Sequence, residues 1–354
     1  KEGPAEILPD VLEGLLSGPT SLYRRLRAQL EAGHGVELDL WDSLDPPGQE
    51  LVQKLIFLED SLARLQGRKS MPHQWQPWEE LYVQELANLE WWLARVEELA
   101  LKLGVDDGLS LESLATRVQR VQVAYGAQFG SFYRDYGTEN PPWPTLTRFL
   151  TELDWHLKGV QPTGLYLILL DGLRLDTWQV LKMEIMGDLP FRSLAEGLLW
   201  APLPTVTESQ KQALEDWGWQ GEFIEGEGAL DQGADLATLW RELEGSSLSP
   251  PERSILRFSF VDNKVHTSLD SYGIFLAEII LQARRLLEPF LRSLPPGSAV
   301  SIFSDHGFAR NYSFRERAKY DEPRYLHGGA SPQEVIVPWA IFRSENSGGI
   351  RPRG

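Results

Sequence analysis

An uninterrupted apolar run at residues 165–170, Leu-Tyr-Leu-Ile-Leu-Leu, constrains the fold of this chain more than any other stretch. A strand that is apolar at every position is buried on both faces, which is typical of a parallel sheet with helices on both sides. From residue 160 onward, strand patterns alternate with helix patterns, among them a long amphipathic helix expected at 272–293. This alternation predicts an α/β domain with a mostly parallel sheet.

The remaining segments complete this outline. Further strands are expected near 197–201, 219–224, 255–261, 299–303 and 335–342, and further helices at 176–186, from about 207 and around 235–243. Residues 4–158 instead have apolar residues three and four apart, interrupted by Gly-Pro and Pro-Pro breaks, which predicts a helical bundle or arm. We therefore expect an all-helical domain at 1–160, the α/β domain at 161–343 and a linker or tail at 344–354.

Composition limits the classes of function. The 354 residues carry a formal net charge of −17 and no cysteine. A general electrostatic grip on nucleic acid needs a basic face, and disulfides or thiolate metal sites need cysteine. No secretion signal or long apolar span is evident, so we expect a soluble, cytoplasmic protein without membrane contact. The opening Lys1 and the Gly- and Ser-rich end favour a fragment of a longer protein.

Chemically competent side chains gather where the expected strands end. Three aspartates and three histidines lie at or near these ends: Asp171, Asp262, His266, Asp305, His306 and His327. In α/β sheets, ligands bind in the crevice outside the carboxyl ends of the strands. Asp262 and His266 are four residues apart, so they share a face if they lie in a helical turn. Each residue also has a structural alternative, such as a helix N-cap for Asp171.

Together these residues favour a metal site. Three carboxylates converging on one crevice would repel each other and would be costly to bury without cations. Oxygen and imidazole ligands, in a chain without cysteine, suit zinc and also accept manganese. Two such ions form the usual clamp on a phosphoryl group, and that chemistry then needs a nucleophile.

Thr207 is the candidate nucleophile. It lies at the expected start of a helix, where free backbone N–H groups favour an anion. Thr205 is an alternative nucleophile, and either threonine could instead serve only as a helix N-cap.

Taken in order, the motifs resemble those of the PglZ domain, a family of the alkaline phosphatase superfamily. The resemblance covers about residues 160–343 and rests on Asp171-x-x-Arg174, Pro204-Thr205-x-Thr207, Asp262-x-x-x-His266, Ser304-Asp305-His306-Gly307-Phe308, Arg324-Tyr325-x-His327-Gly328-Gly329 and Glu334-x-x-x-Pro338. It implies an alkaline-phosphatase-like parallel-sheet sandwich holding two divalent ions. By similarity, one ion is held by Asp171, Thr207, Asp305 and His306, and the other by Asp262, His266 and His327.

The chain departs from the family where the substrate phosphate is oriented. Relatives have an asparagine or arginine shortly after the nucleophile, whereas this chain has Gln210 and Lys211. Lys211 and Arg174 are the candidates for contacting the phosphate, although Arg174 could instead brace Asp171. The segment between His306 and His327 is rich in basic residues, and we expect three of them to contact a polyanionic substrate: Arg310, Arg315 and Arg317. A solvated loop is the alternative.

The resemblance implies a phosphodiesterase or phosphatase acting on a nucleotide, a cyclic oligonucleotide or nucleic acid. The implied setting is a bacteriophage-exclusion (BREX) system, with other defence proteins docking on the helical domain. The alternatives are a non-catalytic scaffold that binds a nucleotide or partner, a PglZ output domain of a signalling protein, and a sulfatase or mutase of the same superfamily.

Overall fold

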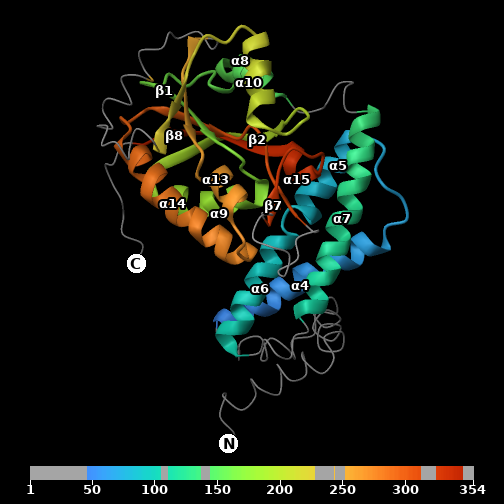
Figure 1. The fold of residues 1–354 in the computed structure, drawn as a ribbon. Helices are drawn as coiled ribbons and strands as arrows, with labels where there is room; N and C mark the ends of the chain where they lie inside the picture. The colour runs from blue at the N-terminus through green and yellow to red at the C-terminus, as the bar shows by residue number, and fades with distance from the viewer. Residues whose placement is uncertain are drawn as a thin grey trace, which may run out of the picture. The chain divides into compact units, whose positions relative to one another are not determined.

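A computed structural model of the chain describes residues 46–104, 111–136, 144–227, 243, 252–311 and 324–345. These residues form an N-terminal helical region and a mixed α/β region built on a six-stranded sheet (Figure 1). The chain divides into two compact units. One comprises Lys1–Pro72, Glu79–Tyr125 and Ser271–Gly273, and the other comprises His73–Trp78, Gly126–Asp270 and Ile274–Gly354.

The N-terminal helices follow the apolar spacing. They are α4 (Pro46–Gly67), α5 (Trp75–Leu81), the π-helical turn η1 (Tyr82–Leu86), α6 (Leu89–Leu103) and α7 (Leu111–Tyr136). α4 buries Leu51, Leu58, Leu62 and Leu65, which recur at helical spacing and form one stripe. α6 ends at Gly104, whose φ of 69° is a left-handed conformation that glycine adopts readily. The expected helical character is confirmed for these residues.

The sheet has the order β2-β8-β5-β1-β4-β3. Its strands are β1 (Leu165–Leu170), β2 (Phe191–Trp200), β3 (Phe223–Glu225), β4 (Ile255–Phe258), β5 (Ala299–Phe303) and β8 (Ile336–Ser344). β5, β1, β4 and β3 run parallel to one another, and β8 runs antiparallel to both β5 and β2. The expected α/β class with a mostly parallel sheet is therefore confirmed.

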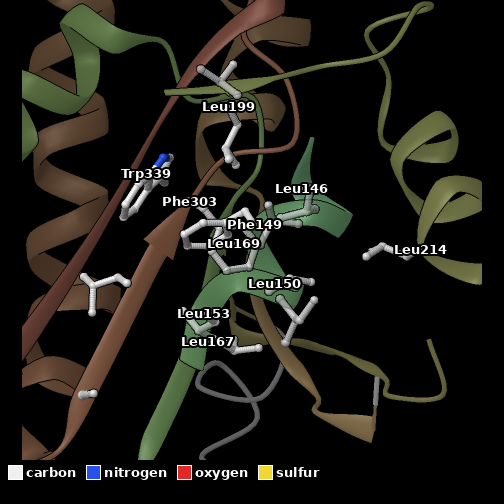
Figure 2. Close-up of a cluster of buried hydrophobic side chains, with 14 of the residues drawn as sticks. Leu146, Phe149, Leu150, Leu153, Leu167, Leu169, Leu199, Leu214, Phe303 and Trp339 are labelled. Atoms are coloured by element: carbon white, nitrogen blue, oxygen red, sulfur yellow. The ribbon is translucent and has the colours of Figure 1, made fainter. Parts of the chain in front are cut away.

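Helices cover both faces of this sheet, as the apolar run of β1 predicts. The main ones are α8 (Leu146–His156), α9 (Leu175–Ile185, extended by the 3-10 turn η3, Met186–Asp188), α10 (Thr207–Asp216) and α14 (Tyr272–Ser293). Leu167 and Leu169 of β1 belong to the cluster around Phe149 of α8 (Figure 2). Tyr166, which points to the opposite face, packs against Phe290 of α14.

Several strand boundaries differ from expectation: β2 begins at Phe191 rather than near 197, and β3 spans Phe223–Glu225 rather than 219–224. β4 stops at Phe258 and a helix, α13 (Phe260–Thr267), begins at once, so the strand expected at 255–261 is shorter. β8 continues to Ser344, into the expected tail. The unit that contains the sheet also includes α8 and the residues of α7 from Gly126 onward. The helix expected around 235–243 lies outside the described residues except for Leu243.

None of the helices in the described ranges is long and apolar enough to cross a membrane.

Candidate metal centre

The turns after β1 and β5 form one side of the candidate site. Because β1 pairs in parallel with β5 on one side and β4 on the other, the carboxyl ends of three strands lie next to one another. β1 delivers Asp171 to this edge, and β5 delivers Asp305 and His306. All three are buried, with at most 1% of their surface exposed.

Gly172 and Ser304 hold these two turns together. Gly172 has a φ of 75°, a region that side chains rarely adopt, and its N–H donates to Oδ1 of Asp305 over 3.3 Å. Oγ of Ser304 accepts the N–H of Leu173 at 2.9 Å and donates to the carbonyl of His306 at 2.7 Å. The glycine and serine of the two motifs therefore fix the geometry of the ligands beside them.

Four of the expected ligands form a first group, called cluster A: Asp171, Thr207, Asp305 and His306. The Thr207 hydroxyl lies 3.2 Å from Oδ1 of Asp171 and 3.4 Å from Nε2 of His306. That Nε2 is 3.3 Å from Oδ1 of Asp171 and 3.8 Å from Oδ2 of Asp305. The four groups converge on one point, as an ion-binding site requires.

The other three form cluster B: Asp262, His266 and His327. α13 places Asp262 and His266 one helical turn apart, so they share a face, with Oδ2 of Asp262 3.4 Å from Nε2 of His266. Oδ1 of Asp262 is 3.2 Å from Nε2 of His327, and the Nε2 atoms of the two histidines are 2.9 Å apart. His327 comes from the loop after β7 (Tyr325–Leu326), which pairs with β6 (Ala309–Arg310).

The two clusters adjoin each other. The rings of His306 and His327 stack with centroids 4.5 Å apart. Two groups of ligand atoms lie within 4.8 Å of one another, one from Asp171, Asp305 and His306 and the other from Asp262, His306 and His327. Buried Asp and His groups that could bind a metal ion are thus present where the sequence predicts them.

The histidine tautomers suit metal binding. Nδ1 of His306 is 3.0 Å from the carbonyl of Gly307, and Nδ1 of His327 is 3.1 Å from the carbonyl of Thr205. A carbonyl only accepts, so each Nδ1 carries the hydrogen and donates it. In the neutral ring, Nε2 then holds a lone pair aimed into the cluster, and a carbonyl partner of this kind commonly orients a metal-binding histidine.

Two carboxylate oxygens support the same interpretation. Among the described residues, Oδ2 of Asp305 and Oδ1 of Asp262 are buried and have no aligned hydrogen-bond donor. An unsatisfied buried acceptor is costly, and each in a native fold calls for an explanation such as a bound ion. The residues present therefore fit a bound metal ion.

The electrostatics of cluster A place a proton where an ion would bind. Burial would raise the pKa of Asp171, yet the hydrogen bond and charge of His306 and the Arg257 guanidinium lower it. Burial and the neighbouring charge of Asp171 raise the pKa of Asp305 to about 6. Burial would lower the pKa of His306, but Asp305 and Asp171 raise it to about 10. In the metal-free protein His306 is therefore an imidazolium between two carboxylates.

Arg257 is a member of the site that the sequence did not indicate. It lies in β4, and Nε and Nη2 of its guanidinium both donate to Oδ2 of Asp171, Nε over 3.0 Å. Nη1 donates to Glu225 over 3.0 Å. The sequence offers one sign of this role: Arg257 is the single charged residue in a strand, β4, that is otherwise apolar. Its partner lies 86 residues away in sequence, so strand pairing alone brings them together.

The structure separates the two threonines. Thr205 uses its hydroxyl to donate to the carbonyl of Gly329 at 3.0 Å and to accept the N–H of Gly328 at 2.9 Å. Thr207 is the first residue of α10, its side chain does not cap that helix, and its hydroxyl faces cluster A. The Thr207 hydroxyl therefore faces cluster A, whereas the Thr205 hydroxyl is engaged by the loop that carries His327.

The candidate phosphate-binding residues lie in different surroundings. Arg174 is fully buried, forms two bonds with Asp176 and lies over the ring of Phe308, so these contacts are structural. Lys211 is exposed on α10, whereas Gln210 is buried and donates to the carbonyl of Asp305 at 2.8 Å. Arg310 lies in β6. Arg315 and Arg317 lie outside the described residues.

Glu334 explains the last sequence motif. It is the third residue of α15 (Pro332–Val335), and its carboxylate accepts the N–H of Gly329 at 2.7 Å and the hydroxyl and N–H of Ser331 at 2.6 and 3.0 Å. A Cβ on Gly329 would lie 2.7 Å from this carboxylate, so a side chain there would displace Glu334 from its present position. Glu334 thus holds the loop that carries His327.

Comparison of the sequence with models of protein families finds no match, and comparison with curated proteins finds none either.

Proposed function

We propose that this protein is a metal-dependent phosphoester hydrolase with an alkaline-phosphatase-like domain of the PglZ type. One observation carries the proposal: the Thr207 hydroxyl, at the start of α10, lies 3.2 Å from Asp171 and 3.4 Å from His306, beside two adjoining Asp/His clusters. A hydroxyl nucleophile next to two such clusters suits phosphoryl transfer better than a purely structural arrangement.

In this proposal cluster A holds one divalent ion and cluster B holds the other, with zinc or manganese matching the oxygen and imidazole ligands. When bound, such ions lower the pKa of a hydroxyl or water and offset charge on the phosphoryl oxygens. The protein's own groups orient the nucleophile and attract the phosphate. Asp171 accepts the Thr207 hydroxyl and orients its oxygen, and the positive end of the α10 dipole favours the phosphate anion.

The reaction proceeds as two displacements at phosphorus. The oxygen of Thr207 forms a bond to phosphorus, the ester bond breaks, and the departing alkoxide or phenoxide takes up a proton. Water then attacks the phosphothreonine, which releases phosphate or a phosphomonoester and restores the Thr207 hydroxyl. By the resemblance, the substrate is a nucleotide or nucleic-acid phosphoester, and the proposed setting is bacteriophage exclusion with partner proteins of that system.

The test combines metal content with turnover of bis(4-nitrophenyl) phosphate by the full chain. We expect the zinc- or manganese-loaded protein to hydrolyse it and Thr207→Ala to lose activity about 1000-fold or more while it still binds metal at cluster B. Asp305→Ala should lose both metal at cluster A and activity. Thr205→Ser, which retains a hydroxyl in the structural position, is the matched control and should keep most of the activity.

A metal-loaded protein that hydrolyses no phosphate ester would contradict the proposal and would favour a binding scaffold. Faster turnover of a 4-nitrophenyl sulfate than of the corresponding phosphate would favour a sulfatase instead.

A further inference from the structure

A groove of about 700 Å³ lies between α13 and α14. Its apolar lining is formed by Phe260, Ile279 and Leu286, which are buried, and by Leu281, which is exposed. Amide and hydroxyl groups of Asn263, Thr267 and Gln282 also line it. A cavity of this size, with apolar walls and a few polar groups, is typical of sites for small organic ligands.

This groove is continuous with cluster B through His266. The His266 side chain lines the groove, yet its Nε2 is 2.9 Å from that of His327 in cluster B. Slightly more than half of its surface is exposed, 55%, so one residue contacts both spaces. Asn263, in the groove lining, directly follows Asp262 of cluster B in α13. A molecule bound at cluster B can therefore extend into the groove.

The charges of the groove exclude a polyanion as its occupant. Among the described residues that line it, two acidic side chains, Glu227 and Glu278, balance two basic ones, Lys264 and Arg285. The Lys264 ammonium is already bonded to Glu278 and, at 3.1 Å, to Asp270. Binding a run of phosphates needs an excess of basic groups, which this lining lacks. The groove instead suits an uncharged group with a flat apolar ring and hydrogen-bonding edges.

We infer that the α13–α14 groove binds the nucleoside part of a single-nucleotide phosphoester. The inference rests on the proposed function, because attack by Thr207 in line expels the ester oxygen on the opposite side of phosphorus. Thr207 belongs to cluster A, so the departing group lies toward cluster B and His266. The base packs against the apolar lining, and the amides of Asn263 and Gln282 face the polar edge of the base.

The test is equilibrium binding of the four free ribonucleosides to the full chain, followed by saturation-transfer NMR, with ribose as a probe without a base. We expect at least one nucleoside, but not ribose, to bind. Gln282→Trp, which fills the groove, should weaken binding at least about tenfold. Arg284→Trp is the bulk-matched control on α14, because Arg284 is exposed, pairs with Glu184 and does not line the groove, and it should bind like the wild type.

Asn263→Trp fills the groove from α13 and replaces Gln282→Trp if that variant does not fold. Absence of nucleoside binding by the wild type, or equal binding by groove and control variants, would overturn the inference. This measurement needs no turnover, so it tests the groove independently of the proposed function. Nucleoside binding without hydrolysis of any ester would contradict only the proposed function. With an active enzyme, Gln282→Trp should raise KM for a nucleoside 5′-monophosphate about tenfold, and Arg284→Trp should leave that KM unchanged.

Discussion

The contact between Arg257 and Asp171 is the main feature of the site at the scale of single residues. Asp171 is completely buried, and Arg257 pairs with one oxygen of its carboxylate while the other oxygen faces Thr207. The carboxylate is therefore kept ionised and has one oxygen left for an ion. This arrangement assigns Arg257 a positioning role toward a ligand of cluster A.

Arg257→Gln should destabilise the metal-free protein by about 2–4 kcal/mol, because it removes one of the two cationic partners of the buried Asp171 carboxylate, the other being His306. Saturating zinc should restore much of this loss, since a cation at cluster A then neutralises Asp171. The measurement is urea unfolding with and without zinc. Arg284→Gln removes an exposed pair with Glu184 and should change stability by less than about 1 kcal/mol in either condition. An equal loss with and without zinc would contradict the positioning role.

Metal affinity at cluster A should rise with pH. Between pH 7 and 9, Asp171 is ionised and Asp305, with a pKa of about 6, is ionised too, whereas His306, with a pKa of about 10, keeps its proton. An ion must displace that proton, so affinity for zinc should increase about tenfold per pH unit. Competition with a chelator across this range measures it, and calorimetry in buffers of different ionisation enthalpy should detect about one proton released.

The same proton has the opposite effect on the metal-free fold. Because the folded pKa of His306 lies above its ordinary value of 6.5, the proton stabilises the fold at low pH, and this contribution is lost as pH rises toward 10. His73→Gln changes an exposed histidine outside both clusters and should leave both pH dependences unaltered. A zinc affinity that does not change with pH would contradict a protonated His306.

Residue types and spacing were sufficient to predict most of the candidate site. The Asp-Gly and Ser-Asp-His stretches after apolar runs predicted Asp171, Asp305 and His306 at one sheet edge, where the structure places them. Arg257 could not be predicted, because its contact depends on the pairing of β1 with β4. The choice of Thr207 over Thr205 also needed the fold, since both are threonines at the start of one helix and only their partners differ.

At the scale of elements, the short helix α15 holds the loop that carries His327. Its capping residue Ser331 and its Glu334 bind each other, and the Glu334 carboxylate also accepts the N–H of Gly329, two residues beyond His327. The Glu334 side chain therefore stabilises the loop of cluster B, while the Glu334 carbonyl accepts the N–H of Gly307, beside cluster A, at 2.9 Å.

Glu334→Gln should weaken cluster B selectively. A glutamine amide has one acceptor oxygen and an NH₂ group that cannot accept the donors now bound, so at least one of them loses its partner. We expect the metal content of the purified protein to fall from two ions toward one, measured by mass spectrometry of the bound metals. Ser331→Ala removes one of the bonds and should have a smaller effect. Retention of two ions by Glu334→Gln would contradict this role of α15.

The junction of β4 and α13 shows the limit of prediction from sequence at this scale. Phe258, Phe260 and Val261 are apolar and continuous with the strand pattern, and all are buried. Apolar character alone cannot show where a buried strand ends and a helix facing the same core begins. In contrast, the spacing of Asp262 and His266 predicted a shared face in a helical turn, and α13 confirms that turn.

At the scale of the whole molecule, the core beside the sheet supports the site above it. Phe149 of α8 is fully buried, with its ring 5.9 Å from Phe303 and 4.7 Å from Trp339 (Figure 2). Phe303 immediately precedes Ser304, so packing on this face of the sheet bears directly on the turn that carries Asp305.

Phe149→Ala should reduce the free energy of unfolding by about 3–5 kcal/mol, because it removes a buried ring and leaves a cavity. Trp155→Ala on the same helix is the matched control: Trp155 is 70% exposed, and its loss should cost less than about 1 kcal/mol. Urea unfolding monitored by circular dichroism measures both. Similar losses for the two variants would show that α8 does not pack on the sheet as described.

The class of fold could be predicted from the chain. Alternating strands and helices after residue 160 predicted the parallel sheet, because both faces of such strands must be buried. The assignment of α8 and the end of α7 to the unit of the sheet depends on which partners their apolar stripes contact. Helical periodicity shows that a stripe exists and does not identify the surface that buries it.

The segment from Thr205 to Thr207 contacts both clusters and fixes the spacing between them. The Thr205 hydroxyl bonds to Gly328 and Gly329, and the Thr205 carbonyl accepts the hydrogen on Nδ1 of His327. Two residues on, the Thr207 hydroxyl contacts Asp171 and His306. Three residues of backbone thus set the distance from the Thr207 hydroxyl to the His327 end of cluster B. If the proposed ions bind, His266 on α13, whose side chain is 55% exposed, is the group with the most room to move between ions of different radius.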